Sequence, residues 1–316
     1  MTGSDLVDPE LKSALEMRPS FEFSRESLAA VRAALTQMRT TLPEPGSEVQ
    51  PEERFVPGPS NAPKVRVLVW RPKGAAENLP AILHLHCGGY IVGSPEMMAA
   101  EHHNICVAHN CVIVSVDYRL APESPYPAPI EDCYAALKWL YQNSRDLGVD
   151  EKRIGVSGES AGGGLAAALA LLARDRGEVS LAFQHLIYPM LDDRTCSRED
   201  PHPCTGQYVW TVESNRFGWT SLLGCQPGGA DISPYAAAAR AHDLSGLPPA
   251  FIAVGALDLF LDENIDYALR LTKAGVAVEL HVYPGAYHGF QVASDARVSI
   301  SARRDSQQAL AKFLTE

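Results

Sequence analysis

The chain has 316 residues, of which 46% are hydrophobic and 21% are charged, a composition typical of a globular protein with a sizeable core. Its formal net charge of -11 repels phosphate backbones, so nucleic acid is not expected as a partner. The N-terminal sequence lacks the regions of a secretory signal, and the longest apolar stretches fall short of the roughly 20 residues of a membrane span. We therefore expect a cytoplasmic protein without a membrane partner.

The N-terminal part of the chain is predicted to be helical. Ser24 can cap a helix whose apolar residues recur at spacings of three and four. These apolar residues are Leu28, Val31, Leu35 and Met38. The Pro- and Gly-containing run 42–46 is expected to end the helix, and a proline-rich connector is expected from Pro51 to Pro63.

From Lys64 onward, short β-rich runs alternate with helical patterns. The predicted strands are 65–70, 81–85, 111–116, 153–156, 183–188, 250–254 and 278–283. The predicted helices between and after them are 97–109, 129–143, 161–176, 262–274 and 300–314. This alternation predicts right-handed β-α-β crossovers, and therefore an α/β fold in which a mostly parallel sheet has helices on both faces.

The segment from Arg194 to Gly229 interrupts the alternation. It carries Cys, Pro, Gly, Trp and Tyr residues without strand periodicity. We expect a helix at 212–223, inserted above the sheet, that forms a cap over the strand ends together with the N-terminal helices. The predicted organisation is cap helices at 1–50 and a catalytic domain at 51–316 with a cap insertion at about 194–229.

The most informative motif is Gly158-Glu159-Ser160-Ala161-Gly162, which fits the pattern G-x-S-x-G. It lies between a predicted strand and an Ala/Leu-rich helix, and the glycines Gly158 and Gly162 stand on both sides of the turn, as a sharp strand-to-helix turn requires. Such a turn exposes the serine at the edge of the sheet, where the helix N-terminus directs free N–H groups at the reacting centre. The motif therefore predicts Ser160 as a nucleophile.

A serine hydroxyl needs a base, and after a nucleophile turn of this kind the acid and then the histidine follow later in the chain. Asp258 follows the predicted strand 250–254, and His288 follows the strand 278–283 in a glycine-flanked loop. Both loops come after the carboxyl ends of strands, where ligand-binding groups gather. We predict that His288 moves the proton and that Asp258 orients the imidazole. Other candidates for the acid are Asp192, Asp193, Asp262 and Glu263.

Acyl transfer also requires fixed N–H donors for the negative charge that develops on the carbonyl oxygen. The run from His84 to Tyr90 contains two consecutive glycines, Gly88 and Gly89, and a loop without side chains there can approach a substrate closely. The N–H group of Ala161, directly after the nucleophile, is the third predicted donor.

Four stretches together resemble the hormone-sensitive-lipase-like esterases, the bacterial family IV of lipolytic enzymes. They are His86-Cys87-Gly88-Gly89, the run from Asp117 to Glu123, the run from Gly158 to Gly163, and the loops that carry Asp258 and His288. The resemblance covers about residues 80 to 290. It implies an eight-stranded α/β-hydrolase core with a helical cap, hydrolysis of short-chain carboxylic esters through an acyl-enzyme, and no cofactor or metal. It also implies oxyanion donors at Gly88, Gly89 and Ala161, and it makes a homodimer a further expectation.

The sequence departs from the family pattern at two positions. Cys87 replaces the first glycine of the usual His-Gly-Gly-Gly, which would cause strain at a positive φ and none at a position that needs only a small residue. Because Gly88 and Gly89 are intact, we favour the second reading. Glu159 stands where the nearest subgroup usually has Asp, and we expect it to orient the turn. A structural role is expected for Asp117, Arg119 and Glu123, with Asp117 and Arg119 as a pair.

The function predicted first is a carboxylesterase that acts on small-molecule esters. An amidase or peptidase on the same fold is an alternative, because both chemistries pass through an acyl-enzyme, and a non-catalytic ligand-binding receptor is another. Seven cysteines without a C-x-x-C pair indicate mostly buried thiols rather than a zinc site or a disulfide framework. Candidate pocket walls are the aromatic residues Tyr90, Tyr208, Trp210, Phe217, Trp219 and Phe290.

Overall fold

The computed structural model describes residues 3–17, 21–39, 48–75, 77–197 and 202–315. Its centre is an eight-stranded sheet in the order β1-β2-β4-β3-β5-β6-β7-β8. The strands are β1 Pro51–Val56, β2 Val65–Trp70, β3 Leu79–Leu85, β4 Val112–Asp117, β5 Val149–Glu159, β6 Gln184–Ile187, β7 Ala250–Gly255 and β8 Val278–Tyr283. β2 is antiparallel to both β1 and β4, and all other neighbours are parallel, which confirms the predicted mostly parallel sheet.

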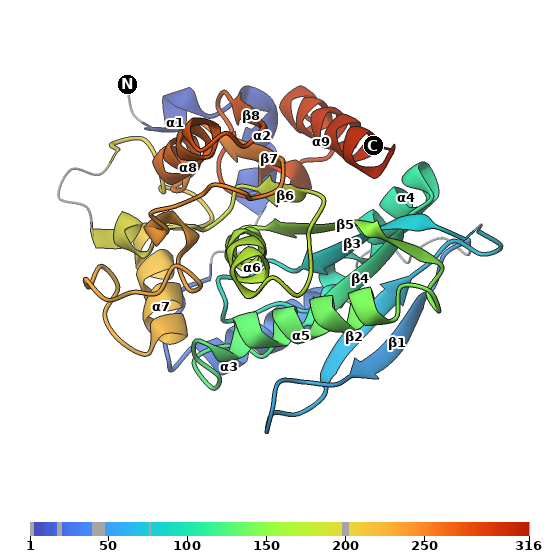
Figure 1. Ribbon diagram of the computed structural model, residues 1–316. Coiled ribbons are helices and arrows are strands. Elements are labelled where there is room, and N and C mark those ends of the chain that lie inside the picture. The colour runs from blue at the N-terminus through green and yellow to red at the C-terminus, as the bar shows by residue number, and fades with distance from the viewer. Residues whose placement is uncertain (1–2, 18–20, 40–47, 76, 198–201, 316) are drawn as a thin grey trace.

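Helices cover both faces of the sheet (Figure 1). The helices are α1 Gly3–Leu6, α2 Pro9–Met17, α3 Leu28–Arg39, α4 Ala99–His109, α5 Ala128–Gln142, α6 Ala161–Arg176, α7 Val212–Leu223, α8 Leu261–Lys273 and α9 Arg297–Thr315. α5, α6 and α8 pack on one face, and α4 and α9 pack on the other. The predicted stop at 42–46, and residues 198–201 of the expected cap insertion, lie outside the described residues. Within the described ranges, no helix is both long and apolar enough to cross a membrane.

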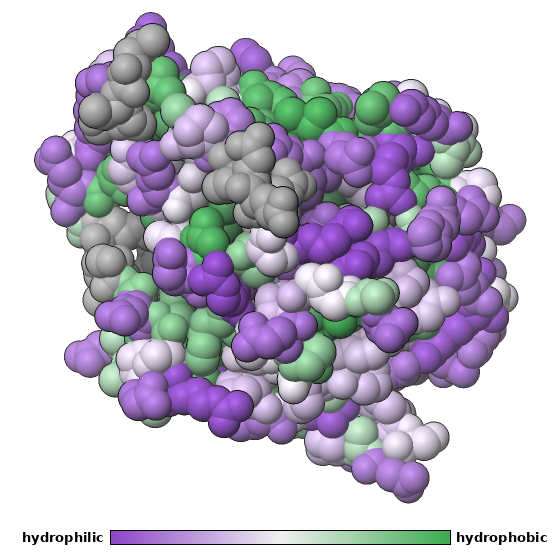
Figure 2. All heavy atoms as spheres, turned by 90° about the vertical axis from the view of Figure 1, so that its left-hand side faces the viewer, coloured by the Kyte–Doolittle hydropathy of each residue, from purple (hydrophilic) through white to green (hydrophobic). Residues whose placement is uncertain are grey.

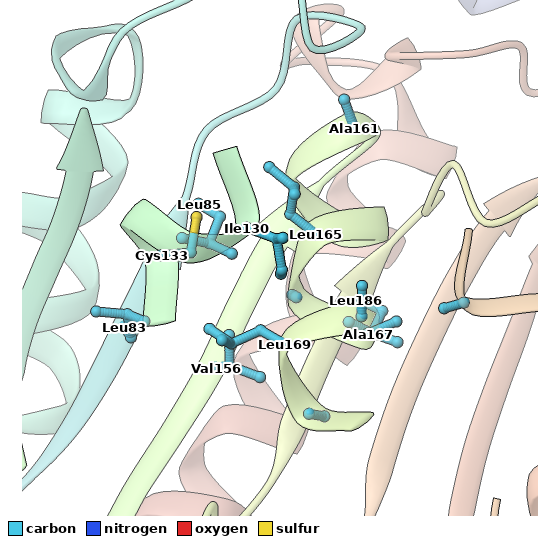
Figure 3. Close-up of a cluster of buried hydrophobic side chains, with 14 of the residues drawn as sticks. Leu83, Leu85, Ile130, Cys133, Val156, Ala161, Leu165, Ala167, Leu169 and Leu186 are labelled. Atoms are coloured by element: carbon cyan, nitrogen blue, oxygen red, sulfur yellow. The ribbon is translucent and has the colours of Figure 1, made fainter. Parts of the chain in front are cut away.

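The strand side chains alternate between two cores. Leu83 and Leu85 of β3 belong to the same cluster of buried side chains as Leu165 and Leu169 of α6, and Leu85 lies near Cys133 and Ile130 of α5 (Figure 3). Ile82, directly before Leu83, points to the other face and packs in the cluster that α4 and α9 close. Because both faces are covered, the central strands are apolar on consecutive residues, as parallel strands are expected to be. Each fully buried leucine stabilises the fold by roughly 1.5–3 kcal/mol.

The predicted connector at Pro51 to Pro63 was wrong over its first half. Residues 51–56 form the edge strand β1, which pairs along its whole length with β2. The strand was not recognised in the sequence because it contains three consecutive charged residues, Glu52, Glu53 and Arg54. An edge strand tolerates such residues because it is largely exposed. Pro51 is the first residue of the strand, a position where a missing N–H is tolerated.

The predicted pair of Asp117 with Arg119 was also wrong. Arg119 binds Asp132 of α5 through two charge-assisted hydrogen bonds of 2.7 and 2.8 Å. Asp117 instead accepts a hydrogen bond of 3.0 Å from Arg66 of β2. Asp117 is the last residue of β4 and Arg119 lies beyond the strand, and the two side chains bind different neighbouring elements, β2 and α5. The structural role expected for Glu123 rests on its ion pair with Arg32 of α3, at 2.7 Å.

Candidate active site

The turn between β5 and α6 holds Ser160 in a strained backbone conformation, with φ at 56° and ψ at -120°. Few residues other than glycine adopt a positive φ, and they persist there only when surrounding contacts fix them. Here the N–H group of Ser160 donates to the carbonyl of Ile187, and its own carbonyl accepts from Met190, both at 2.9 Å. The chain that leaves β6 therefore holds the serine in place.

Glycines beside the serine allow α6 to start directly against the sheet. A Cβ atom on Gly162 would lie 2.0 Å from the carbonyl oxygen of Leu85, at the end of β3. A Cβ atom on Gly158 would lie 2.4 Å from the carbonyl carbon of Gly162. In both cases the obstacle is backbone, which cannot move aside as a side chain can. The glycines that the motif predicted are thus required by close backbone approach.

Three side chains from distant parts of the chain meet at this turn. The Nε2 atom of His288 lies 3.0 Å from Oγ of Ser160, and its Nδ1 atom lies 2.8 Å from Oδ2 of Asp258. The second carboxylate oxygen of Asp258 accepts a hydrogen bond of 3.0 Å from the N–H group of Phe260. All three side chains are buried. This geometry allows the imidazole to take a proton from the hydroxyl while the carboxylate stabilises the resulting charge.

The other carboxyl groups considered from the sequence have different partners. Asp192 binds Arg194, and Asp193 binds Arg240. Glu263 accepts a hydrogen bond of 2.6 Å from the N–H group of Leu191, and burial raises its pKa well above the ordinary value. Asp262 lies in the first turn of α8. Among the described residues, Asp258 is the acid that hydrogen-bonds to the imidazole of His288.

Aromatic rings surround the imidazole of His288. The rings of Tyr188 and Phe260 meet it edge to face, at centroid distances of 4.8 and 5.2 Å, and the indole of Trp210 lies 6.5 Å away. Contacts with rings on three sides restrict the rotation of the imidazole. Sequence reasoning missed Tyr188 and Phe260 at this site, because both lie at the ends of elements whose positions depend on the tertiary fold.

The glycine loop after β3 lies beside the serine. Gly88 and Gly89 have φ values of 129° and 59°, which glycine adopts without strain. Within the described part of the chain, the N–H groups of Gly88, Gly89 and Ala161 donate no hydrogen bond to protein atoms. N–H groups without an acceptor in the protein are available to bind an oxyanion.

Cys87 does not have a positive φ, so its side chain causes no backbone strain, in agreement with the expectation that this position requires only a small residue. Its carbonyl accepts a hydrogen bond of 2.8 Å from Nδ1 of His86. Burial lowers the pKa of His86 to about 4, so the ring is neutral. The neutral ring supports the loop through this hydrogen bond to the Cys87 carbonyl. The ring of Tyr118 stacks on His86 at 4.1 Å, and its hydroxyl donates to the His86 carbonyl at 2.7 Å.

A buried polar pair underlies the nucleophile turn. The carboxylate of Glu159 lies 3.0 Å from Nε2 of His84, whose Nδ1 lies 3.2 Å from Oγ of Ser115. Burial acts to raise the pKa of Glu159, but the charge and hydrogen bond of His84 outweigh burial, so the pKa is lowered. Sequence reasoning missed His84, although its place one strand away from Glu159 follows from the parallel pairing of β3 with β5.

A cavity of about 1290 Å³ adjoins Ser160 and His288. This is larger than most ligand pockets, which hold about 300–1,000 Å³. Apolar side chains of the N-terminal segment, such as Phe21 and Phe23, form one part of its wall, and residues 207–211 form another. Of the six aromatic residues predicted as walls, Tyr208 and Trp210 line the cavity, whereas Tyr90, Trp219 and Phe290 are buried in the core and Phe217 packs against it.

In the part of the chain that the structure describes, no group of three or more His, Cys, Asp or Glu side chains is arranged to hold a metal ion. All seven cysteines are free thiols. Four are buried, namely Cys106, Cys111, Cys133 and Cys196. The cysteines therefore behave mostly as small apolar side chains.

The chain is similar in sequence and in fold to known proteins. Residues 82–292 match the family described as alpha/beta hydrolase fold. The chain is 38% identical to the carboxylesterase NlhH of Mycobacterium tuberculosis, over 90% of this chain and 88% of that protein. It is 34% identical to the esterase LipI of the same organism, over 90% and 88%. A bacterial heroin esterase superposes with a TM-score of 0.91 and 37% identity, covering 98% of each chain. The chain belongs to the α/β-hydrolase-fold family, within its hormone-sensitive-lipase-like branch.

Proposed function

We propose that this protein is a serine carboxylesterase, with Ser160 as nucleophile, His288 as general base and acid, and Asp258 as the residue that orients the imidazole. One observation carries the proposal: a continuous hydrogen-bonded chain runs from Oγ of Ser160 through the imidazole to the buried carboxylate. Ser160 and His288, at one end of this chain, line a cavity large enough for a small ester. The names of the similar proteins, carboxylesterase and esterase, point to the same reaction.

The reaction proceeds in two displacements. In the first, Oγ of Ser160 attacks the ester carbonyl as its proton passes to Nε2 of His288, and the new oxyanion accepts hydrogen bonds from the N–H groups of Gly88, Gly89 and Ala161. Collapse of the tetrahedral intermediate expels the alcohol, which takes the proton from the imidazolium. In the second, His288 deprotonates a water molecule that attacks the acyl-enzyme, and the acid leaves as Ser160 recovers its proton.

The proposed substrates are small esters with short acyl chains. The total volume of the cavity does not impose this limit, because about 1290 Å³ could hold a longer chain. The limit comes from the rings of Tyr188 and Trp210, which line the cavity and lie against the imidazole, and so restrict the space beside the reacting carbonyl. The cytoplasmic location, the homodimer and the division into cap and catalytic domain stay predictions.

Hydrolysis of a series of p-nitrophenyl esters from acetate to laurate tests the proposal. We expect the highest kcat/KM between acetate and hexanoate, and a loss of several orders of magnitude in kcat for Ser160→Ala and His288→Ala, with the thermal unfolding midpoint little changed. An enzyme that cleaves p-nitroacetanilide as fast as p-nitrophenyl acetate would instead be an amidase. Folded protein that hydrolyses none of these compounds would contradict the proposal and favour a binding function.

A further inference from the structure

The oxyanion glycine Gly89 is covered by a single indole ring. A Cβ atom on Gly89 would lie 2.1 Å from Cη2 of Trp210 and 2.7 Å from its Cζ2, so the six-membered ring of the indole lies directly on the Gly89 backbone. Gly89 is itself buried, with a φ of 59°. The side chain of any other residue at this position would collide with the indole ring. Its backbone would also be strained, because residues other than glycine rarely adopt a positive φ. The indole thus leaves the glycine little freedom to move.

Helix α7, which begins two residues after Trp210, makes a second contact with Gly89. A Cβ atom on Gly218, in the middle of α7, would lie 2.9 Å from the carbonyl oxygen of Gly89 and 3.4 Å from Cζ2 of Trp210. Residue 218 must therefore be very small for α7 to approach so closely. The backbone of Gly89 is consequently held by the indole and by the helix backbone at Gly218.

Trp210 is fixed by contacts of its own. Its Nε1–H group donates a hydrogen bond of 3.1 Å to Oδ1 of Asn215, which is fully buried on α7. Its ring lies 5.5 Å from the ring of Phe23 in the N-terminal segment. Thr211, the next residue, caps α7 by accepting a hydrogen bond from the N–H group of Ser214. A side chain bound to the first turn of a capped helix cannot easily adopt another rotamer.

We propose that Trp210 is a positioning residue for the oxyanion loop: together with Gly218 it transmits the position of α7 to Gly89 and keeps the N–H group of this glycine directed at the reacting carbonyl. The inference rests on the proposed function. In Figure 1, α7 lies on the side of the molecule away from β1, and Figure 2 shows that hydrophilic and hydrophobic residues are interspersed over this side. A helix at the periphery of the fold thereby supports a group that acts at its catalytic centre.

The experiment measures kcat and KM for p-nitrophenyl acetate, together with the inhibition constant of an alkylboronic acid, in the full-length protein. A boronic acid forms a tetrahedral adduct with the serine and places an oxygen where the oxyanion develops, so its affinity reports the positioning of the donors. The variants are Trp210→Ala and Trp210→Phe, the second of which keeps an aromatic ring but lacks the far ring that reaches Gly89. Phe217→Ala is the matched control, because this aromatic residue of α7 does not line the cavity.

We expect both Trp210 variants to lower kcat for the acetate by about 10- to 100-fold, since complete loss of one oxyanion donor costs about 10²- to 10³-fold. KM should change little, the boronate inhibition constant should rise by the same factor as kcat/KM falls, and Phe217→Ala should stay within about twofold of wild type in all three quantities. Gly218→Ala provides a second perturbation if a Trp210 variant does not fold, and it should also lower kcat, because the added methyl group displaces Gly89.

Three results decide the outcome. Folded Trp210 variants that keep the kcat of wild type for the acetate, and only shift the acyl-chain preference toward longer esters, would leave Trp210 with no role beyond lining the pocket and overturn the inference. Loss of kcat without weaker boronate binding would overturn it too, because the donors would then be unaffected. Failure of the proposed function is distinguishable from both, since wild-type protein would then hydrolyse no ester, or Ser160→Ala would remain as active as wild type.

Discussion

Replacement of Gly162 by alanine has two opposite effects on the free energy of unfolding. Helix propensity alone predicts a gain of at most about 1 kcal/mol, which is the cost of glycine relative to alanine in a helix interior, because Gly162 lies in the first turn of α6. Close packing predicts a loss, because the new Cβ atom would lie 2.0 Å from the carbonyl oxygen of Leu85 and 2.5 Å from that of His86. Ordinary van der Waals contact begins near 3.4 Å, so α6 and the end of β3 must separate by more than 1 Å.

Overpacking of this kind costs typically 1–3 kcal/mol, and the obstacle here is backbone, so we expect Gly162→Ala to lower the free energy of unfolding by about 3 kcal/mol. The free energy of unfolding is measured by urea denaturation, with circular dichroism as the probe. The matched control is Gly229→Ala, where a Cβ atom meets nothing within 4 Å, and it should remain within about 1 kcal/mol of wild type. A Gly162→Ala protein as stable as wild type would refute the packing argument and leave helix propensity as the dominant effect.

Three further predictions concern charged and titratable groups. Asp258→Asn should lower kcat for p-nitrophenyl acetate by roughly 10⁴-fold, as the equivalent change does in a serine protease, and a loss below tenfold would remove Asp258 from its proposed role. Burial raises the pKa of Glu263, so the folded chain keeps a proton that the unfolded chain loses above about pH 4.3; stability is therefore lost as pH rises, by at most about 1.4 kcal/mol per pH unit. Glu263→Gln should become progressively more stable than wild type between pH 5 and pH 8 in urea titrations, and parallel pH profiles would argue against a buried acid. Burial lowers the pKa of His185 to about 4, so stability should fall as pH drops from about 6.5 toward 4, and His185→Gln should flatten that part of the profile.

The sheet could be predicted from the sequence because its central strands are buried on both faces. Runs such as Val112-Ile113-Val114 are apolar on every residue, and helical patterns separate them. β1 escaped prediction because it pairs with one neighbour only and exposes most of its side chains, so that charged residues fill it. Edge strands obey weaker sequence constraints than central ones.

The residues proposed for the chemistry were predictable because each follows a strand of the sheet. Parallel strands end at one edge, so loops far apart in sequence meet there, and the geometry places Ser160, Asp258 and His288 within hydrogen-bonding distance. The supporting contacts were not predictable. The packing of Trp210 on Gly89 depends on the path of a segment without strand or helix periodicity, and one aromatic residue among many carries no signal of such a contact.

Covalent labelling of the serine tests the central claim most directly. Intact protein treated with a fluorophosphonate and measured by mass spectrometry should gain one adduct per chain, located by peptide mapping on Ser160, in parallel with the loss of esterase activity. His288→Ala should react far more slowly, because the hydroxyl then lacks its base. An active enzyme that takes up no adduct, or one whose adduct and activity both survive Ser160→Ala, would contradict the claim.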